Sequence, residues 1–316
     1  MKKVIICIIT AAFCFGTMEV ALKISVSSLD PLQITFLRFM IGGFVLLPFG
    51  IAEMRRSGYR LSASDIGWVT LIGIIGIPVS MLAFQLGLQS CNAATAAAIV
   101  CTNPLFTMLF AHLFTSEKMN RRKTAAFFLG IIAACFLIRP WDIQEGNTFH
   151  GLLLLVFASV TFGTYTVMSR RRIARIGAFT QTGLSFILGS LVLFVIMIPL
   201  GHPAFTGIIS NWAGILYCGL IATGLGYLAY FIAIQYSDAS TGSMAIFIKP
   251  ALAAVCARLI LNEDIYWNTV VGIILLLVAS MLTVYDTIRA RQTGYIRARS
   301  SITSTRDSIR SKRHSR

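Results

Sequence analysis

Charged residues are scarce in this chain. Only 12% of its 316 residues are charged and 12 residues are acidic, whereas 56% are apolar and the mean hydropathy is +0.78. Soluble domains carry about 25% charged residues. The composition therefore excludes an ordinary soluble globular protein and indicates an integral membrane protein.

Patterns that mark catalytic or metal sites are missing as well. The chain has four histidines, none of them in an HExxH pattern, and it contains no GxSxG nucleophile motif. Its seven cysteines lie singly in or beside apolar segments without a CxxC pair, so neither a disulfide framework nor a metal site is indicated. We therefore expect a protein that is not an enzyme and that binds no metal and no cofactor.

Apolar runs of membrane-spanning length are abundant. A transmembrane helix needs about 20 mostly apolar residues. Because the connections between the runs are mostly short, neighbours in sequence should be antiparallel neighbours in space. The ten candidate spans are 4–25, 32–51, 65–88, 93–115, 122–138, 151–169, 179–200, 211–235, 241–261 and 268–286.

The chain repeats itself at an offset of 146 residues. An apolar stretch with a proline near its start and a glutamate at its end occurs at 102–117 and again at 248–263, and Pro104 corresponds to Pro250. Each repeat would hold five helices, an odd number, so the second repeat must enter the membrane from the opposite side. We predict an all-α integral membrane protein with ten transmembrane helices in two inverted five-helix repeats.

Lysine and arginine are distributed unevenly among the connections. With a cytoplasmic N-terminus, 22 of the 27 basic residues fall in cytoplasmic segments and only Arg139 falls in an external loop. This bias places both termini in the cytoplasm, and the excess charge then serves topology and membrane lipids rather than nucleic acid. The predicted division is a first repeat at 1–138, an external linker at 139–150, a second repeat at 151–286 and a basic disordered cytoplasmic tail at 287–316.

Ionisable residues inside predicted spans are the first candidates for function, because charge in the bilayer is costly. Glu19 and Arg38 lie at similar depths on the external side of their spans, so they are predicted to pair. Lys249 lies near the centre of the ninth span, where it is a candidate for holding an anionic group of a substrate. A Glu–Arg pair that only holds helices together is the alternative.

Helix-breaking and polar residues complete the candidate site. Pro104 and Pro250 each free a backbone carbonyl, which protein or water must satisfy; this points to a cavity, with a tolerated kink as the alternative. Asn103 is the repeat counterpart of Lys249, so both should face the centre. The remaining pocket candidates, for which simple packing is the alternative, are Gln85, Tyr165, Tyr227 and Tyr230.

These motifs resemble those of the EamA-type transporters of the drug/metabolite transporter (DMT) superfamily, over residues 4–285. The resemblance implies a ten-helix inner-membrane carrier, usually an exporter of metabolites or amino acids that is often driven by an ion gradient. The residues that carry it are Asp30–Phe39 (DPLQITFLRF), the two proline helices with Glu117 and Glu263, the glycines Gly130 and Gly272, and Phe-Gly-Thr at 15–17 and 162–164.

We therefore expect a multi-pass secondary active transporter of the cell (inner) membrane with alternating access at a cavity between the repeats. The charges within the spans sum to a positive value, which favours a small-molecule substrate with an anionic group. Proton coupling, export against import, and a homodimer are left open by the sequence. A carrier for hydrophobic cations (drug efflux) and a non-transporting membrane scaffold are the alternative functions.

Thiol labelling tests the topology. The predicted external loops are 89–92 and 262–268. A membrane-impermeant thiol reagent applied to intact cells should label a cysteine placed at Asn268 and miss one placed at Ser300. The reverse labelling pattern would refute cytoplasmic termini.

Overall fold

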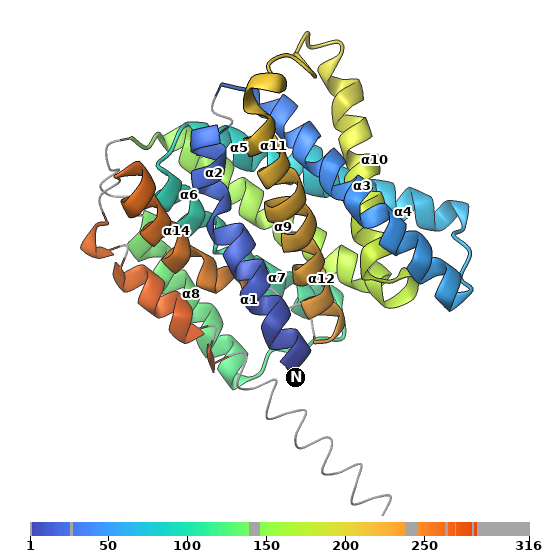
Figure 1. The fold of residues 1–316 in the computed structure, drawn as a ribbon. Helices are drawn as coiled ribbons and strands as arrows, with labels where there is room; N and C mark the ends of the chain where they lie inside the picture. The colour runs from blue at the N-terminus through green and yellow to red at the C-terminus, as the bar shows by residue number, and fades with distance from the viewer. Residues whose placement is uncertain are drawn as a thin grey trace, which may run out of the picture.

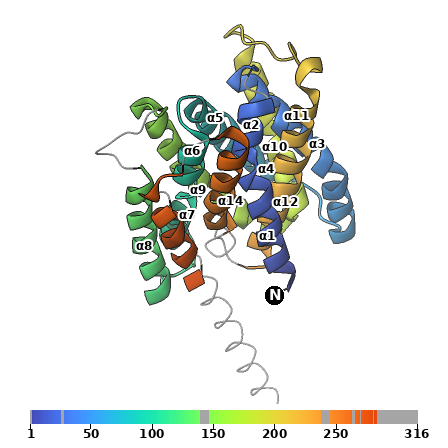
Figure 2. The same cartoon turned by 60° about the vertical axis from the view of Figure 1, so that its left-hand side comes forward.

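The protein is a helical bundle. The computed structural model describes residues 2–25, 28–138, 146–237, 245–262, 265–268, 270–279 and 281–282, and no strand occurs in these ranges. Figures 1 and 2 show α1 (Lys2–Gly16) running beside α12 (Gly226–Gln235). Predictions for Glu263, for residues 139–145 and 238–244 and for the tail 287–316 fall outside the described residues.

Within the described part of the chain, seven helical segments are long and apolar enough to cross a membrane. This bears out the prediction of a multi-pass membrane protein. The seven segments are Lys2–Ile24, Pro31–Ser57, Ala63–Gln89, Ala93–Phe114, Phe149–Ile176, Ala178–Met197 and Ile209–Gln235.

Three further helices lie where the fifth, ninth and tenth spans are predicted. They are α8 (Arg121–Ile138), α14 (Ala245–Leu261) and the short apolar helix Val270–Ala279. The first carries three basic residues in its first turn, and the other two are shorter than 18 residues. The number of ten transmembrane helices therefore stays a prediction.

The boundaries of α3 (Pro31–Ser57) follow directly from its sequence. The Asp30 carboxylate accepts hydrogen bonds from the backbone N–H groups of Leu32 and Gln33, at 2.8 and 3.4 Å, which would otherwise lack partners at a helix start. Proline at the first helical position is compatible with a helix because that position needs no N–H donor. Gly58, with φ of 67°, ends the helix in the left-handed conformation that glycine tolerates.

Two spans change helical form at mid-length. The π-helical segment η1 (Ile75–Met81) lies between α4 (Ala63–Ile74) and α5 (Leu82–Gln89). A second π-helical segment, η3 (Tyr217–Leu225), joins α11 (Trp212–Leu216) to α12. Pro78 lies inside η1 and removes one backbone donor, whereas η3 contains no proline. Such segments are frequent at functional sites because they widen the helix locally.

The two repeat-related prolines occupy different local structures. Pro104 lies in the first turn of α7 (Asn103–Phe114), which is separated from α6 (Ala93–Val100) by a turn, whereas Pro250 lies inside α14. At the break before α7, the carbonyl of Ile99 accepts hydrogen bonds from Thr102 Oγ1 at 2.7 Å and from Ser159 Oγ at 3.1 Å. The hydroxyl group of Ser159 on the neighbouring helix thus supplies a hydrogen-bond donor to a carbonyl at the break, which apolar surroundings could not do.

The packing of the helices sets the position of the centre. The α1 helix packs against α12 and α14, and α9 (Phe149–Ile176) packs against α5 and α7. The α3 helix packs along α10 (Ala178–Met197) and against η3. The segments α1, α7, α9, α12 and α14 therefore converge on one region, which Figure 1 shows behind and beside α1.

Close glycine contacts recur in the two halves. A Cβ atom added at Gly16 would lie 2.9 Å from Leu252 Cβ, and one added at Gly163 would lie 2.8 Å from Phe106 Cβ. Leu252 and Phe106 are 146 residues apart, the repeat offset found in the sequence, and Gly16 and Gly163 are 147 apart, within one residue of it. The contact of α1 with α14 therefore has a counterpart in the contact of α9 with α7, and in both a glycine lets the helices approach closely.

One position chosen for thiol labelling is not accessible. Asn268 is 1% exposed and its amide donates a hydrogen bond to the carbonyl of Phe136 at 2.9 Å, so the expectation of an exposed loop residue there is wrong. The side chain folds back onto α8 because its polar group finds a backbone partner there. Tyr266, 43% exposed, is the better position for the labelling experiment.

Substitution of two glycines in α4 tests the packing. A Cβ atom at Gly73 would lie 2.4 Å from the carbonyl oxygen of Ser185, whereas one at Gly67 would meet nothing within 4 Å. We expect Gly73→Ala to destabilise the protein by about 1–3 kcal/mol, because backbone must move apart. The control Gly67→Ala should be neutral or gain up to about 1 kcal/mol, since alanine favours a helix. Thermal unfolding of the detergent-purified variants measures both, and equal stabilities would contradict the close α4–α10 contact.

Candidate substrate and coupling site

A buried ion pair lies at the centre of the bundle. Glu19 stands in the first turn of α2 (Met18–Ser25), after a break in the first span at Thr17, and Lys249 comes from α14. The Lys249 ammonium contacts Glu19 Oε1, and the two residues are 2% and 0% exposed. The second carboxylate oxygen, Oε2, has no hydrogen-bond partner among the described residues.

Arg38 is a second buried cation near this pair. It is fully buried in α3, and its Nη1 donates to the sulfur of Met18 at 3.3 Å. Its guanidinium carbon lies 4.7 Å from the ring centroid of Phe39 and 5.8 Å from that of Phe84, so aromatic faces supply part of its stabilisation. Within the described part of the chain, Nε and Nη2 of Arg38 make no hydrogen bond.

The predicted ion pair between Glu19 and Arg38 is not formed in this structure. A similar depth along two helices does not fix the direction in which their side chains point. The α2 helix packs on α14, which presents Lys249, whereas α3 packs mainly on α10 and η3. The carboxylate therefore takes its partner from α14.

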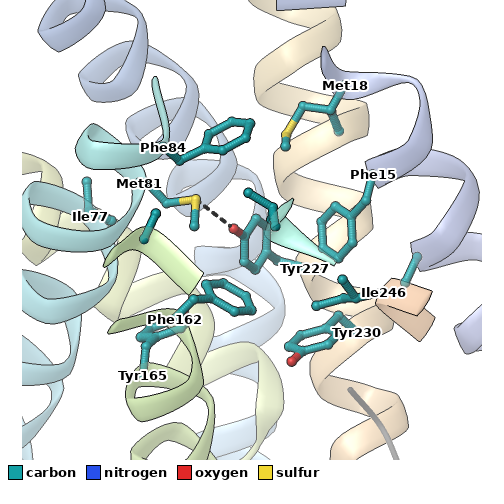
Figure 3. Close-up of a cluster of buried hydrophobic side chains, with 14 of the residues drawn as sticks. Phe15, Met18, Ile77, Met81, Phe84, Phe162, Tyr165, Tyr227, Tyr230 and Ile246 are labelled. Carbon is teal, nitrogen blue, oxygen red and sulfur yellow. Dashed lines mark hydrogen bonds between the residues drawn. The ribbon is translucent and has the colours of Figure 1, made fainter. Parts of the chain in front are cut away.

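An aromatic and thioether cluster surrounds a small cavity beside Lys249. The free space is about 20 Å³, which is room for a single water molecule and not for a metabolite. Figure 3 shows the side chains of several helices closing on this space. The lining residues are Phe15, Met18, Met81, Phe84, Val100, Asn103, Phe162, Tyr227, Ile246 and Lys249.

Tyr227 lies in the middle of this cluster. Its hydroxyl donates a hydrogen bond to the sulfur of Met81 at 3.2 Å, the dashed line in Figure 3. Its ring contacts Phe15 edge to face, with centroids 4.9 Å apart, and packs on Phe186 at 5.1 Å. Met81 and Tyr227 are separated by 146 residues, so positions that correspond in the two repeats touch each other here.

The structure brings some predicted site residues together and separates others. Asn103, Lys249 and Tyr227 line the cavity. Tyr230 is buried next to it and its hydroxyl lies 3.1 Å from Thr166 Oγ1 in a hydrogen bond. The predicted residues that do not line the cavity are Glu19, Arg38, Gln85, Tyr165, Tyr230, Pro104 and Pro250.

Two buried amides of the predicted site, Asn103 and Gln85, have unused acceptors. The side-chain oxygens of Asn103 and Gln85 form no hydrogen bond with any described residue, although the side chains are 2% and 5% exposed. An unpaired buried acceptor costs about 1–3 kcal/mol. The site therefore has hydrogen-bond acceptors that no described protein group uses, and the one on Asn103 belongs to a residue that lines the cavity.

Several lining residues were missed by the sequence reasoning. The sulfur atoms of Met18 and Met81 and the ring of Phe84 surround Arg38 and Tyr227, and nothing separates them from other apolar residues in the sequence. Phe15 and Phe162 are different, because both begin the repeated Phe-Gly-Thr. The repeated Phe-Gly-Thr could therefore have indicated two lining residues of the cavity.

No group of three or more potential metal ligands occurs in the residues that the structure describes.

Apolar helices around a buried charged centre define a multi-pass membrane protein of the transport class. The EamA-like transporter family matches the sequence twice, over residues 2–139 and 149–285, and the chain belongs to this family. The recognition made from the repeated proline helices is thereby confirmed.

Two of the related proteins are named as transporters, and a third is named as WAT1-related. An uncharacterized transporter of Clostridium kluyveri is 32% identical and covers 89% of this chain and 93% of its own length. The transporter YoaV of Bacillus subtilis, also uncharacterized, is 25% identical over 87% of this chain and 94% of its own length. A chloroplastic WAT1-related protein of Arabidopsis thaliana is 23% identical over 87% of this chain and 68% of its own length. A solved crystal structure, 20% identical, superposes with a TM-score of 0.70 over 90% of this chain and 98% of its own, which supports the fold.

A double-mutant cycle tests the central ion pair. Glu19→Gln leaves the cations Lys249 and Arg38 without an anion, and we expect a loss of about 3–5 kcal/mol. Lys249→Met strands the carboxylate, which can take up a proton, so its cost should be smaller. The double variant should be more stable than the sum of the two losses predicts. With both side chains replaced, neither the Glu19 carboxylate nor the Lys249 ammonium remains as a buried charge without its partner. Thermal unfolding of purified protein measures the coupling, and strictly additive losses would show that the two side chains act independently.

Proposed function

We propose that this chain is a secondary active transporter of the inner membrane that exports a small metabolite or amino acid with an anionic group. Its termini lie in the cytoplasm, and it works by alternating access between two inverted five-helix halves. The observation that carries the proposal is the charge balance of the centre. Two fully buried cations, Arg38 and Lys249, face one buried carboxylate, Glu19.

Recurring contacts support the two inverted halves. The glycine contacts of α1 with α14 and of α9 with α7 correspond to within one residue of the repeat offset. The π-helical segments η1 and η3 lie in the third span and in its counterpart. Contact between the corresponding residues Met81 and Tyr227 is expected where a two-fold axis passes between the halves. The central cavity adjoins this contact, so rocking of the halves would open and close it.

Arg38 is the residue best suited to hold the anionic group. Lys249 was the sequence-based candidate, but its ammonium is already engaged by Glu19. The unused Nε and Nη2 atoms of Arg38 form one edge of the guanidinium, and that edge grips a carboxylate through two parallel hydrogen bonds. A hydrophobic cation would instead add positive charge to a site that already has an excess of it.

Glu19 is the proposed coupling residue. Protonation of its carboxylate would release Lys249, and ionisation would restore the pair, so the proton and the conformation are linked. The cavity of about 20 Å³ has no room for a substrate, which fits an occluded state without substrate. Opening toward either side must then part the aromatic residues around Tyr227.

Transport by reconstituted variants tests the assignment. Metabolite profiling of a deletion strain against an overproducing strain first identifies the transported solute. In proteoliposomes, Arg38→Lys keeps the charge but loses the two-pronged hydrogen bonding, so KM should rise about 10- to 100-fold. Glu19→Gln should abolish flux driven by a pH gradient and leave exchange of substrate for substrate intact.

The matched control is Arg258→Gln, which removes an exposed arginine from α14, the same helix as Lys249. It should transport like the unmodified chain. Unchanged KM in Arg38→Lys would remove Arg38 from substrate recognition, and unchanged pH dependence in Glu19→Gln would assign the coupling elsewhere. The absence of any saturable flux in the unmodified chain would favour a membrane scaffold.

A further inference from the structure

A second cavity lies between α4 and α9, away from the central site. Its volume is about 280 Å³, and it shares no lining residue with the central cavity. It combines an apolar wall with a basic rim. The lining residues are Trp68, Ile72, Met168, Arg171, Arg172 and Arg175.

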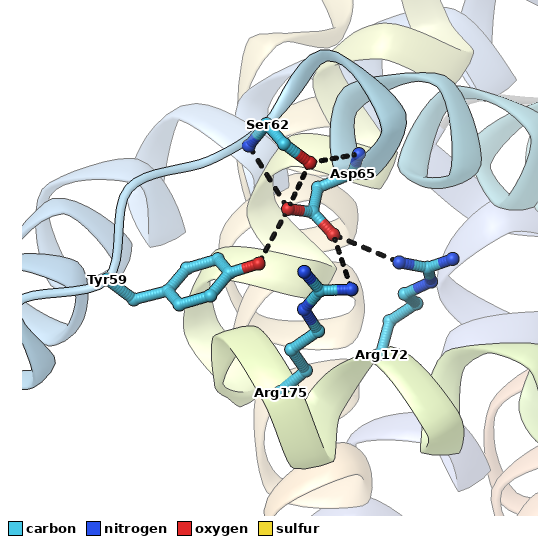
Figure 4. Close-up of polar contacts among 5 residues, drawn as sticks. All are labelled: Tyr59, Ser62, Asp65, Arg172 and Arg175. Carbon is cyan, nitrogen blue, oxygen red and sulfur yellow. Dashed lines mark hydrogen bonds and ion pairs between the residues drawn. The ribbon is translucent and has the colours of Figure 1, made fainter.

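The rim has more positive charge than its acidic partner can balance. Asp65 pairs with Arg172 at 3.0 Å and with Arg175 at 3.6 Å (Figure 4). Arg171, which is exposed, forms no ion pair or hydrogen bond within the part of the chain that the structure describes. Three arginines therefore face one carboxylate.

The Asp65 carboxylate is fixed in its position by hydrogen bonds from Tyr59 and Ser62. Asp65 Oδ2 accepts hydrogen bonds from Tyr59 Oη and Ser62 Oγ, both at 2.7 Å, and from the Ser62 N–H at 3.1 Å. The last of these belongs to a capping box at the start of α4. Figure 4 shows the arginines approaching its other oxygen from α9. Arg172 and Arg175 are thereby held in place before any ligand binds.

The wall of the cavity continues into an exposed apolar surface. Trp68 is 44% exposed and its ring lies 5.1 Å from the guanidinium carbon of Arg172. Ile66 and Leu71, on the same helix, are exposed as well. A soluble anion has no use for an apolar wall, whereas a phospholipid fits both parts. Tryptophan is also the residue that favours the boundary between lipid tails and headgroups.

We propose that this cavity binds an anionic phospholipid, with its phosphate at Arg171 and Arg175 and its acyl chains along Trp68 and Met168. Basic pockets between transmembrane helices bind anionic headgroups through the same combination of charge and apolar contact. The bound lipid would bridge α4 and α9, which come from different halves of the chain. The site does not depend on which solute the central cavity carries.

Lipid titration followed by native mass spectrometry tests the site. The detergent-purified full chain is titrated with phosphatidylglycerol and, separately, with phosphatidylcholine of the same acyl chains. Phosphatidylglycerol should bind several-fold more tightly, and Arg171→Gln should weaken it about fivefold, as expected for one arginine at an anionic lipid surface. Arg171 has no hydrogen bond or ion pair to lose among the described residues, so this variant should fold normally. Trp68→Ala should weaken the binding of both lipids.

The control is Arg121→Gln, an exposed arginine at the start of α8, which should leave phosphatidylglycerol binding unchanged. Equal binding of the two lipids, or equal effects of Arg171→Gln and Arg121→Gln, would overturn the proposal. Glycerol 3-phosphate supplies the phosphate without acyl chains. If it displaces phosphatidylglycerol at an equal concentration, the cavity is a site for soluble phosphate compounds and the lipid assignment fails.

Discussion

The contact between Glu19 and Lys249 is the interaction on which the centre of this protein depends. A charged side chain within a bilayer costs about 2.5–3.5 kcal/mol even on the mildest scale. The structure holds three such side chains close together, all at most 2% exposed. One ion pair compensates two of the charges, while aromatic rings and the sulfur of Met18 surround Arg38. Loss of the carboxylate would leave two cations in an apolar interior.

The surrounding helices are built to accommodate this centre. The first span is broken at Thr17, directly before the turn that carries Glu19, and the fourth is broken before Asn103. Spans three and eight change to π-helical form at mid-length. Backbone groups that lose their helical partner at an irregularity of this kind cannot be satisfied by lipid. Hydroxyl groups from adjacent helices satisfy some of them, as Ser159 does for the carbonyl of Ile99.

The sequence predicted those features that depend on period and composition. The apolar runs predicted the positions of the long helices, and the repeat predicted that Asn103 and Lys249 face a common centre, where both line the cavity. The sequence did not predict features that depend on the direction in which a side chain points around its helix axis. The sequence predicted a similar depth for Glu19 and Arg38 and therefore an ion pair, yet Glu19 contacts Lys249 because α2 packs on α14. The π-helical segments were also missed, since one extra residue per turn leaves no trace in a uniformly apolar run such as 217–225.

On the proposed assignment, charge counting explains why binding and closure should be linked. With Glu19 ionised, the empty centre has a net charge of +1 from Arg38, Lys249 and Glu19. A carboxylate at Arg38 would bring that sum to zero, so the dry, closed form is less costly when the substrate is bound. Protonation of Glu19 raises the charge of the empty centre to +2, which favours hydration and opening. The anion and the proton thus act on closure in opposite directions, so substrate affinity and the pH dependence of transport should both change when Glu19 is neutralised.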